Sequence, residues 1–232
     1  HVYGVSLIFL KGENLGRDII MTQTEIEKLV KKQRDFFNSG ETLNVSFRIS
    51  ALEKLRACII KYEKKINQAI RADLGKSAFE SYMCETGLVL SELTYMIKHT
   101  RKFAKERTVH TPLAQFHSRS YQKPSPYGVV LIMSPWNYPL MLTLEPLVDA
   151  LAAGNTAIVK PSAYSANTSE LISRMLGECF DEKYVAVVTG GREENTCLLN
   201  EHFDYIFFTG SQSVGKEVMR CASAHLTPIT LE

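Results

Sequence analysis

The sequence predicts an α/β fold in which a parallel, Rossmann-like sheet with crossover helices follows an α-helical amino-terminal region. Residues 126–232 alternate short apolar segments with longer segments of helical periodicity. Continuous apolar strands separated by helices are typical of a parallel sheet that is covered on both faces. Residues 23–106 instead repeat apolar side chains at three- and four-residue steps, which predicts amphipathic helices.

The amino-terminal region, assigned to residues 21–106, is expected to contain three helices. The first begins near residue 23, and the second ends at Gly75, because glycine readily closes a helix. The third is predicted from about residue 79 to residue 104. Residues 107–125 are expected to be a linker followed by an exposed strand at 118–123, where polar and apolar residues alternate weakly.

The second region, residues 126–232, is expected to hold five strands and four crossover helices. The strands are predicted at residues 129–133, 157–159, 185–188, 205–208 and 228–231. The helices are predicted at residues 141–153, 165–178, 192–201 and 212–225. Ligands of parallel sheets bind beyond the carboxyl ends of the strands, so the residues that follow each strand are the candidate site residues.

Composition and charge exclude several classes of protein. The 27 basic and 25 acidic residues give a net charge of +2, too small to predict a nucleic-acid partner. The longest clean apolar run, 129–133, is far shorter than the roughly 20 residues of a membrane span.

Five cysteines without C-x-x-C spacing predict neither a disulfide framework nor a zinc site, and no other metal site is predicted. They favour a reducing compartment, which we expect to be the cytoplasm. Residues 1–20 are expected to be a leader added for expression, because His1 is not an initiator and the helical pattern begins only at Met21. A remnant of a native signal is the weaker alternative.

Two predicted strands are followed by residues that suit a binding site. The first is followed by Ser134-Pro135-Trp136-Asn137-Tyr138-Pro139, where two prolines fix a turn around an amide. Such an amide can donate to a developing oxyanion, although an isolated asparagine more often bonds its own turn. The second is followed by Lys160-Pro161-Ser162. A lysine there can reach a ribose hydroxyl or a phosphate, or it can remain solvated.

The fourth predicted strand leads into Thr209-Gly210-Ser211, small residues that let a phosphate approach backbone N–H groups at a helix start. Residues 210–216 also have the G-x-x-x-x-G-K spacing of a P-loop. Glu217, however, stands where a P-loop has the Ser or Thr that binds Mg²⁺. A P-loop NTPase is therefore the weaker alternative, and the G-x-G-x-x-G dinucleotide fingerprint is absent as well.

In this order and at these spacings, the motifs resemble those of NAD(P)-dependent aldehyde dehydrogenases. The similarity covers about residues 21–232, and the helical half is similar to the shorter, class-3-like branch. Its motifs are PYGVV at 126–130, SPWNYP at 134–139, AAGNT at 152–156, KPS at 160–162, FFTGS at 207–211, TLE at 230–232, DLGK at 73–76, FESY at 79–82 and TPLAQF at 111–116. The resemblance implies oxidation of a small aldehyde to a carboxylate with NAD or NADP. It also implies a full-length homodimer or homotetramer, with an oligomerisation arm within residues 107–125.

The resemblance also implies roles for single residues. Asn137 would be the oxyanion donor, and Glu232 would be a buried general base that activates water. Taken alone, Glu232 could also be a solvated residue at a frayed chain end. Lys160 would hold the cofactor ribose, Trp136 would wall the site near the nicotinamide, and Gly215 would let its helix pack closely. Gly210 and Ser211 would meet the pyrophosphate. The full cofactor-binding set is Ser134, Pro135, Trp136, Lys160, Ser162, Gly210, Ser211 and Gly215.

The sequence departs from the family pattern in two places. Ala163 stands where family members often have an acidic residue that bonds the adenosine ribose, which leaves the choice between NAD and NADP open. The family's cysteine nucleophile lies in a Gly-Gln-x-Cys context, which surrounds none of the five cysteines at 58, 84, 179, 197 and 221. The chain is therefore expected to be the amino-terminal portion of an aldehyde dehydrogenase. Its fold would be incomplete, without the catalytic domain, and it would be inactive by itself. The alternative is a non-catalytic nucleotide-binding module derived from the same fold.

Overall fold

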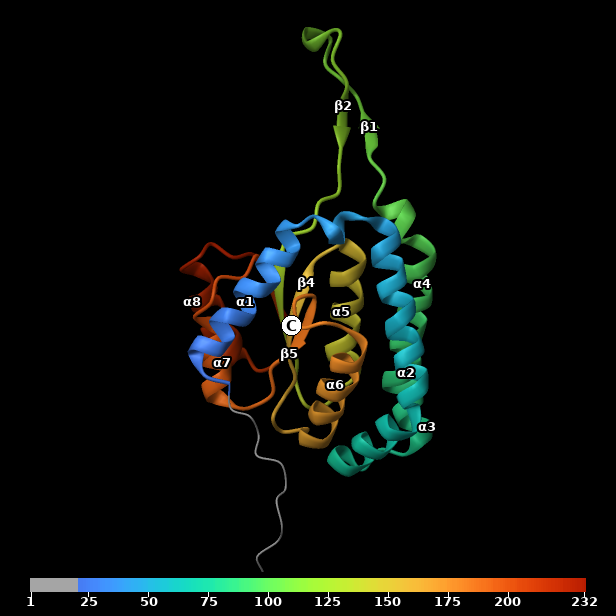
Figure 1. Ribbon diagram of the computed structural model, residues 1–232, viewed down its shortest axis with the longest axis vertical. Helices are drawn as coiled ribbons and strands as arrows, with labels where there is room; N and C mark the ends of the chain where they lie inside the picture. The colour runs from blue at the N-terminus through green and yellow to red at the C-terminus, as the bar shows by residue number, and fades with distance from the viewer. Residues whose placement is uncertain (1–20) are drawn as a thin grey trace, which may run out of the picture.

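The computed structural model describes residues 21–232, and the leader expected at 1–20 lies outside the described residues. Within them, parallel strands form a five-stranded sheet in the order β5-β4-β3-β6-β7. Strands β4 and β5 of this sheet lie near the centre of Figure 1. The strands are β3 (Val129–Met133), β4 (Thr156–Lys160), β5 (Val185–Val187), β6 (Tyr205–Phe208) and β7 (Ile229–Leu231). Each predicted strand is confirmed to within one residue at either end.

The predicted crossover helices are confirmed to within two residues. They are α5 (Met141–Ala153), α6 (Ala166–Cys179), α7 (Arg192–Leu199) and α8 (Gln212–Ser223). Helices α5 and α6 cover one face of the sheet, and α7 and α8 cover the other face together with α1 (Gln23–Asn38). Gly154 ends α5 with a φ of 98°, a left-handed conformation that favours glycine.

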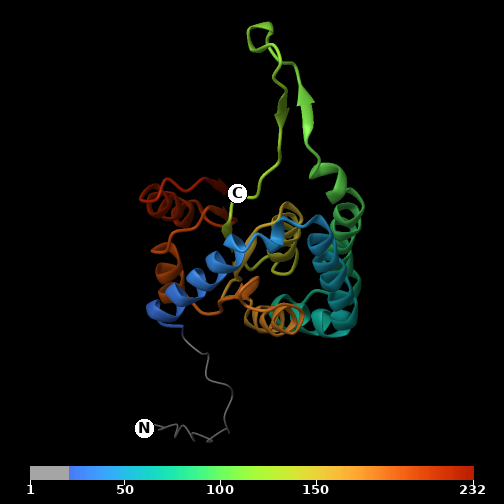
Figure 2. The same ribbon diagram turned by 45° about the horizontal axis from the view of Figure 1, so that its top comes forward.

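The amino-terminal helices wrap this layered sheet on two sides. The short 3-10 helix η1 (Glu41–Leu43) leads from α1 to α2 (Val45–Leu74), which packs on α6, and α4 (Gly87–Phe103) packs on α5 (Figure 2). One prediction is wrong here, because the expected third helix is not a single α-helix. It consists of α3 (Ala78–Ser81), a π-helical segment η2 (Tyr82–Thr86) and α4. The wide turn brings the Tyr82 carbonyl oxygen to 2.7 Å from the position of a Cβ on Gly87, so a side chain has no room there.

Residues 107–125 differ from the expected linker. β1 (Arg107–Val109) pairs antiparallel with β2 (Ser120–Gln122), with Thr108 opposite Tyr121, and the short 3-10 helix η3 (Leu113–Gln115) lies between them. The hairpin projects away from the rest of the chain (Figures 1 and 2). The strand at 107–109 was missed because all three of its residues are exposed, so no apolar alternation marks it.

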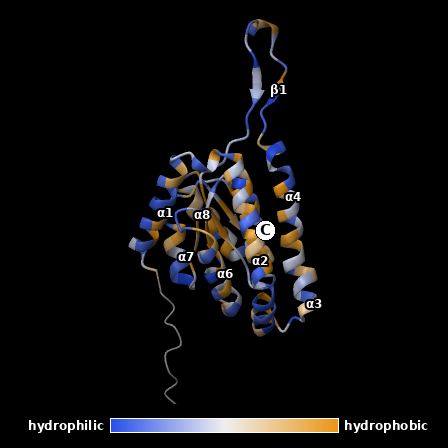
Figure 3. Ribbon diagram, turned by 45° about the vertical axis from the view of Figure 1, so that its right-hand side comes forward, coloured by the Kyte–Doolittle hydropathy of each residue, from blue (hydrophilic) through white to orange (hydrophobic). Residues whose placement is uncertain are grey.

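Alternate side chains of the central strands feed two apolar cores. Val130 and Ile132 pack with α5 and α6, whereas Val129 and Leu131 pack with α1, α7 and α8. Apolar residues accordingly concentrate between the helices and the sheet, and polar residues lie on the outer helix faces (Figure 3). Among residues 21–232, no helix combines the length and the apolar character that crossing a membrane requires.

Candidate functional site

The carboxyl edge of the sheet contains a topological switch point. The chain runs outward from β3 to β4 and β5, and then returns to place β6 on the other side of β3. The loops that follow β3 and β6 therefore leave the sheet in opposite directions, and such points are where doubly wound sheets bind ligands. The N–H of Thr209 donates to the Met133 carbonyl at 3.1 Å, which holds the two strand ends together.

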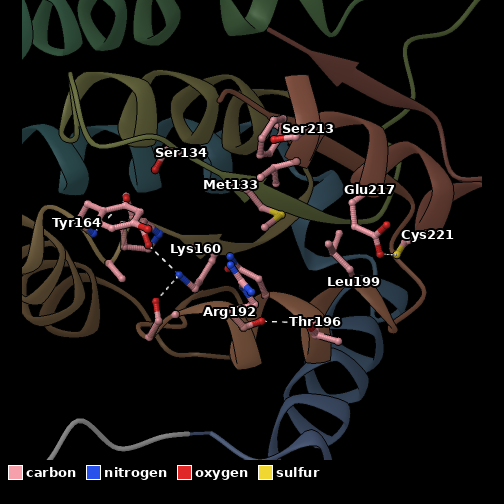
Figure 4. Close-up of a pocket in the computed structure, with 18 of the residues that line it drawn as sticks. Met133, Ser134, Lys160, Tyr164, Arg192, Thr196, Leu199, Ser213, Glu217 and Cys221 are labelled. Atoms are coloured by element: carbon pink, nitrogen blue, oxygen red, sulfur yellow. Dashed lines mark hydrogen bonds between the residues drawn. The ribbon is translucent and has the colours of Figure 1, made fainter. Parts of the chain in front are cut away.

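A cavity of 710 Å³ opens at this edge (Figure 4). Its size falls within the range of roughly 300–1,000 Å³ that is typical of small-molecule sites. The loops after β3, β4 and β5 line it together with helices α7 and α8, and its polar lining includes Ser134, Lys160, Ser162, Arg192, Ser213 and Glu217. The remaining predicted residues lie outside this lining, along the loops after β3, β6 and β7 and on α8; they are Pro135, Trp136, Asn137, Gly210, Ser211, Gly215 and Glu232.

Lys160 is a buried cation in the wall of the cavity. It is the last residue of β4 and is only 3% exposed. Its Nζ donates to the carbonyl oxygens of Pro161 at 2.9 Å and Gly190 at 2.8 Å (Figure 4). An ammonium group has three donors, so one N–H remains for a ligand. Burial lowers the pKa of Lys160 to about 8, although the nearby Glu194 acts in the opposite direction.

This lowered pKa predicts a stability that depends on pH. Between the folded pKa of Lys160, about 8, and its usual value of 10.5, the unfolded chain binds more protons than the folded chain. The free energy of unfolding should therefore rise with pH across this window, relative to that of a Lys160→Met variant. Urea unfolding of both proteins from below pH 8 to above pH 10 measures the difference between their free energies of unfolding. Groups other than Lys160 contribute to both proteins and cancel in this difference. If this difference did not change with pH, the lowered pKa of the buried Lys160 would be contradicted.

Hydrogen bonds among Ser134, Thr143 and Pro139 fix the turn after β3. The buried Ser134 hydroxyl bonds the Thr143 hydroxyl at 2.5 Å, and the latter donates to the Pro139 carbonyl at 2.5 Å. Asn137 is exposed, and its side-chain amide bonds no residue in 21–232. The alternative in which this asparagine bonds its own turn is therefore not observed, and the amide is available to a ligand.

A buried ion pair from the helical region supports the same turn. The Lys76 Nζ lies 2.7 Å from Glu85 Oε1 and donates to the Asn137 carbonyl at 2.9 Å. The other oxygen of Glu85, which is fully buried, accepts the N–H of Leu140 at 2.8 Å. The pair thus holds the turn at two points, one on each side of Pro139. Sequence reasoning missed this role, although Lys76 belongs to the DLGK motif.

Asp73 supports the turn after β4 in a similar way. Its carboxylate accepts the backbone N–H groups of Asn167 at 3.1 Å and Thr168 at 2.7 Å, together with both of their side chains. A helix N-terminus attracts anions, and at α6 the protein's own carboxylate occupies that position. The contact joins residues 94 positions apart in the sequence, so local pattern gave no signal for it.

The loop after β6 enters α8 through Gly210 and Ser211. The Ser211 hydroxyl caps the helix by accepting the Val214 N–H at 3.4 Å. A Cβ on Gly210 would lie 2.6 Å from the Phe208 ring, so this position has no room for a side chain. A Cβ on Gly215 would lie 3.6 Å from the same ring, an ordinary contact, so the close packing expected to require a glycine there is not observed.

Glu232 follows β7 at the same edge. Its N–H donates to the Phe208 carbonyl at 3.0 Å, and its carboxylate accepts the Thr209 hydroxyl at 3.3 Å. The side chain is exposed, which differs from the burial expected of a general base, because no segment within residues 21–232 covers it.

The carboxylate of Glu217 at the rim of the cavity is already paired. Arg220 donates to its two oxygens at 2.9 and 2.6 Å and lowers the pKa of Glu217 to about 2. The Cys221 thiol donates to the same carboxylate at 3.5 Å. Glu217 occupies the position where a P-loop binds Mg²⁺ through a hydroxyl, and its pairing with Arg220 gives the P-loop alternative no support.

Comparison with known proteins identifies the family. A sequence profile described as the aldehyde dehydrogenase family matches residues 10–232. The chain belongs to the aldehyde dehydrogenase family. The resemblance inferred from the motifs is thereby confirmed, including its class-3 character, since several similar relatives are named as family 3 members.

Two relatives show how much of their own length this aldehyde dehydrogenase chain matches. The 4,4'-diaponeurosporen-aldehyde dehydrogenase of Staphylococcus aureus is 45% identical over 89% of this chain and 45% of its own length. The family 3 member A2 enzyme of Rattus norvegicus is 44% identical over 89% of this chain and 43% of its own length. The chain therefore spans about half the length of the curated relatives it matches.

Solved structures agree with this aldehyde dehydrogenase fold. The substrate-bound state of Staphylococcus aureus AldH superposes with a TM-score of 0.88 at 45% identity, over 89% of this chain and 45% of that chain. An NAD⁺ complex of an aldehyde dehydrogenase from Bacillus cereus gives a TM-score of 0.80 at 25% identity, over 90% of this chain and 43% of that chain.

Proposed function

We propose that this chain supplies the cofactor-binding portion of an NAD(P)⁺-dependent aldehyde dehydrogenase that oxidises a small aldehyde to a carboxylate. The observation that carries the proposal is the switch point, where the Asn137 turn and the Gly210-Ser211 helix start flank neighbouring strands. The cavity beside it contains a lysine with one free N–H. A dinucleotide fits these features for two reasons. The position of Gly210 has no room for a side chain, so a phosphate can approach the backbone there, and Lys160 can donate to a ribose hydroxyl.

The cofactor, when bound, accepts a hydride from the substrate. Lys160 orients the ribose through its remaining N–H, and the first N–H groups of α8 face the negatively charged pyrophosphate beside Ser211. Asn137 donates its side-chain N–H to the aldehyde oxygen as negative charge develops on that atom. Glu232 accepts a proton from the water that releases the carboxylic acid.

We propose that none of the cysteines at 58, 84, 179, 197 and 221 is the nucleophile, because the family's Gly-Gln-x-Cys context surrounds none of them. Cys58 and Cys179 are buried between α2 and α6, and burial raises the pKa of Cys179 to about 12, so its thiol is unreactive. The Cys221 thiol donates a hydrogen bond to the Glu217 carboxylate, and the pKa of Cys221 is also raised, chiefly by burial. We therefore expect no turnover of aldehyde by residues 1–232 alone. The second candidate is a non-catalytic nucleotide-binding module. Such a module would bind the cofactor, but a protein that extends this chain to the length of its relatives would not turn over aldehyde.

Further properties of the whole enzyme also remain proposals. A relative from Canis lupus familiaris, 42% identical over 90% of this chain and 46% of its own length, is named a dimeric, NADP-preferring aldehyde dehydrogenase. This name favours a dimer, and the projecting β1–β2 hairpin is the segment we propose as the oligomerisation arm. A cytoplasmic location stays a prediction from the free cysteines.

Substituting Glu232 by glutamine in a protein that extends this chain to the length of its relatives tests the proposal. The first equivalent of NAD(P)H should still form rapidly, because hydride transfer precedes hydrolysis. Steady-state turnover should fall by roughly 10²-fold or more, which is the usual loss for a general base. Glu193→Gln, an exposed change on α7, is the matched control. Normal turnover by the Glu232→Gln enzyme would contradict the role of Glu232. Turnover of aldehyde by the 232-residue chain, if Cys221→Ser abolished it, would contradict the assignment of the nucleophile.

A further inference from the structure

We infer that Arg192 binds a phosphate on the 2′-hydroxyl of the adenosine ribose, so that the cavity selects NADP⁺ over NAD⁺. The inference rests on the dinucleotide site proposed above and adds a specificity-determining residue to it. It is carried by an unpaired guanidinium, by acidic neighbours that are already bonded, and by the absence of a carboxylate at position 163.

Arg192 lies where a ligand of the cavity can reach it. It is the first residue of α7, directly after the Gly190-Gly191 turn that follows β5. Its side chain lines the same cavity as Lys160 and Ser162 and points into it (Figure 4). Within residues 21–232 the guanidinium forms no ion pair and no hydrogen bond, so all five of its N–H donors are available.

Two acidic residues near Arg192, Glu194 and Glu217, are engaged elsewhere, and the exposed Glu193 lies outside the cavity lining. Glu194 is buried, and its carboxylate accepts the Gly191 N–H at 2.6 Å. Glu217 is held by two hydrogen bonds from Arg220, as described above. The cavity therefore presents the cations of Lys160 and Arg192 without a free carboxylate among its lining residues. Such a site favours a ligand with additional negative charge.

The turn after β4, which neighbours the turn after β5 in the cavity wall, contains no carboxylate that would repel a 2′-phosphate. The turn after β4 places Ala163 where a carboxylate could bond the ribose hydroxyls and repel a phosphate. The N-terminus of α6 cannot take the phosphate, because Asp73 already binds its N–H groups. The Ser162 hydroxyl accepts the Tyr164 N–H at 3.2 Å and keeps its own proton for donation. Arg192 is thus the charged donor left for the phosphate, with Ser162 as a neutral partner.

Two adenosine nucleotides isolate this contact. 5′-AMP and 2′,5′-ADP differ only in the 2′-phosphate, and isothermal titration calorimetry of the 232-residue chain measures the affinity of each. We expect 2′,5′-ADP to bind about ten-fold more tightly, the effect of a charge-assisted hydrogen bond, and the gain should shrink as salt is added. Arg192→Ala should remove most of the gain, and Arg192→Lys should keep part of it. Arg174→Ala, which alters an exposed arginine paired with Glu170 on α6, is the matched control and should leave the ratio unchanged.

The outcomes separate this inference from the function on which it rests. Equal affinity for the two nucleotides, or a gain that survives Arg192→Ala, would overturn the role of Arg192 while the cofactor site stands. Binding of neither nucleotide to a chain with a cooperative thermal transition by circular dichroism would reject the cofactor site and this inference together. The same circular dichroism measurement shows that each variant is folded.

Discussion

Replacing Asn137 by alanine is expected to lower kcat by on the order of 10²–10³ in a protein that extends this chain to the length of its relatives, the usual loss for one oxyanion donor. The side-chain amide bonds no residue within 21–232, and only the backbone carbonyl of Asn137 holds the turn. The substitution therefore removes a donor to the substrate without removing a contact that shapes the site. Steady-state kinetics measures the change, and the KM for the cofactor should stay nearly constant.

A matched control and a stability measurement make this result interpretable. Asn38→Ala, at the exposed end of α1, should leave kcat unchanged. The thermal midpoint of Asn137→Ala should equal that of the parent protein. An Asn137→Ala enzyme with normal kcat would remove the amide from the mechanism, whereas a loss of both kcat and stability would show that it acts on the fold.

Replacing Glu85 by alanine is expected to lower the free energy of unfolding by about 3–5 kcal/mol, the usual cost of breaking a buried ion pair. The Glu85 carboxylate is fully buried, and the Lys76 side chain is only 12% exposed. The substitution leaves the Lys76 ammonium without its counter-ion and the Leu140 N–H without its acceptor. Urea unfolding of the 232-residue chain, followed by circular dichroism, measures the effect.

Glu170→Ala is the matched control for this prediction. Glu170 also pairs with a basic residue at 2.8 Å, but that pair with Arg174 is largely exposed. Its removal should change stability by less than about 1 kcal/mol, because exposed ion pairs contribute little. Equal effects of the two substitutions would show that burial of the Lys76–Glu85 pair has no energetic consequence.

Three residues from positions 73 to 85 connect the helical region with the proposed site. Asp73 caps the helix after β4, and the Lys76–Glu85 pair holds the turn after β3. The π-helical segment η2 contains Glu85. The amino-terminal helices therefore do more than cover the sheet, since they also fix the two turns that flank the first two strands of the proposed cofactor site.

The sheet and its crossover helices could be predicted because they bury apolar residues at a regular spacing. The strand β1 and the π-helical segment could not, since β1 is fully exposed and the bond from the Gly87 N–H to the Tyr82 carbonyl, which widens the turn, leaves no mark in the apolar spacing. Sequence reasoning correctly placed Asn137 after β3 and Lys160 at the end of β4, because apolar runs mark both strands, and their role in a site remains a prediction. It missed Asp73, Lys76 and Glu85, whose hydrogen bonds to the two turns join positions 55 to 94 residues apart in the chain.

Two expectations about single residues also needed the structure. A Cβ at Gly215 meets Phe208 at an ordinary distance, whereas Gly210 has no room for one, and spacing alone does not separate these two glycines. Glu232 is exposed, as in the solvated alternative, and does not have the burial that the role of a general base implies. Burial depends on what covers a strand end, and the sequence of that strand does not contain this information.

The most direct test of the proposed cofactor site is a calorimetric titration of the 232-residue chain with NAD⁺ and NADP⁺, with MgATP as the control nucleotide. The proposal predicts saturable binding of dinucleotide, weakened in Lys160→Met, and no binding of MgATP. Binding of MgATP alone, or of no nucleotide to a chain with a cooperative thermal transition, would contradict it.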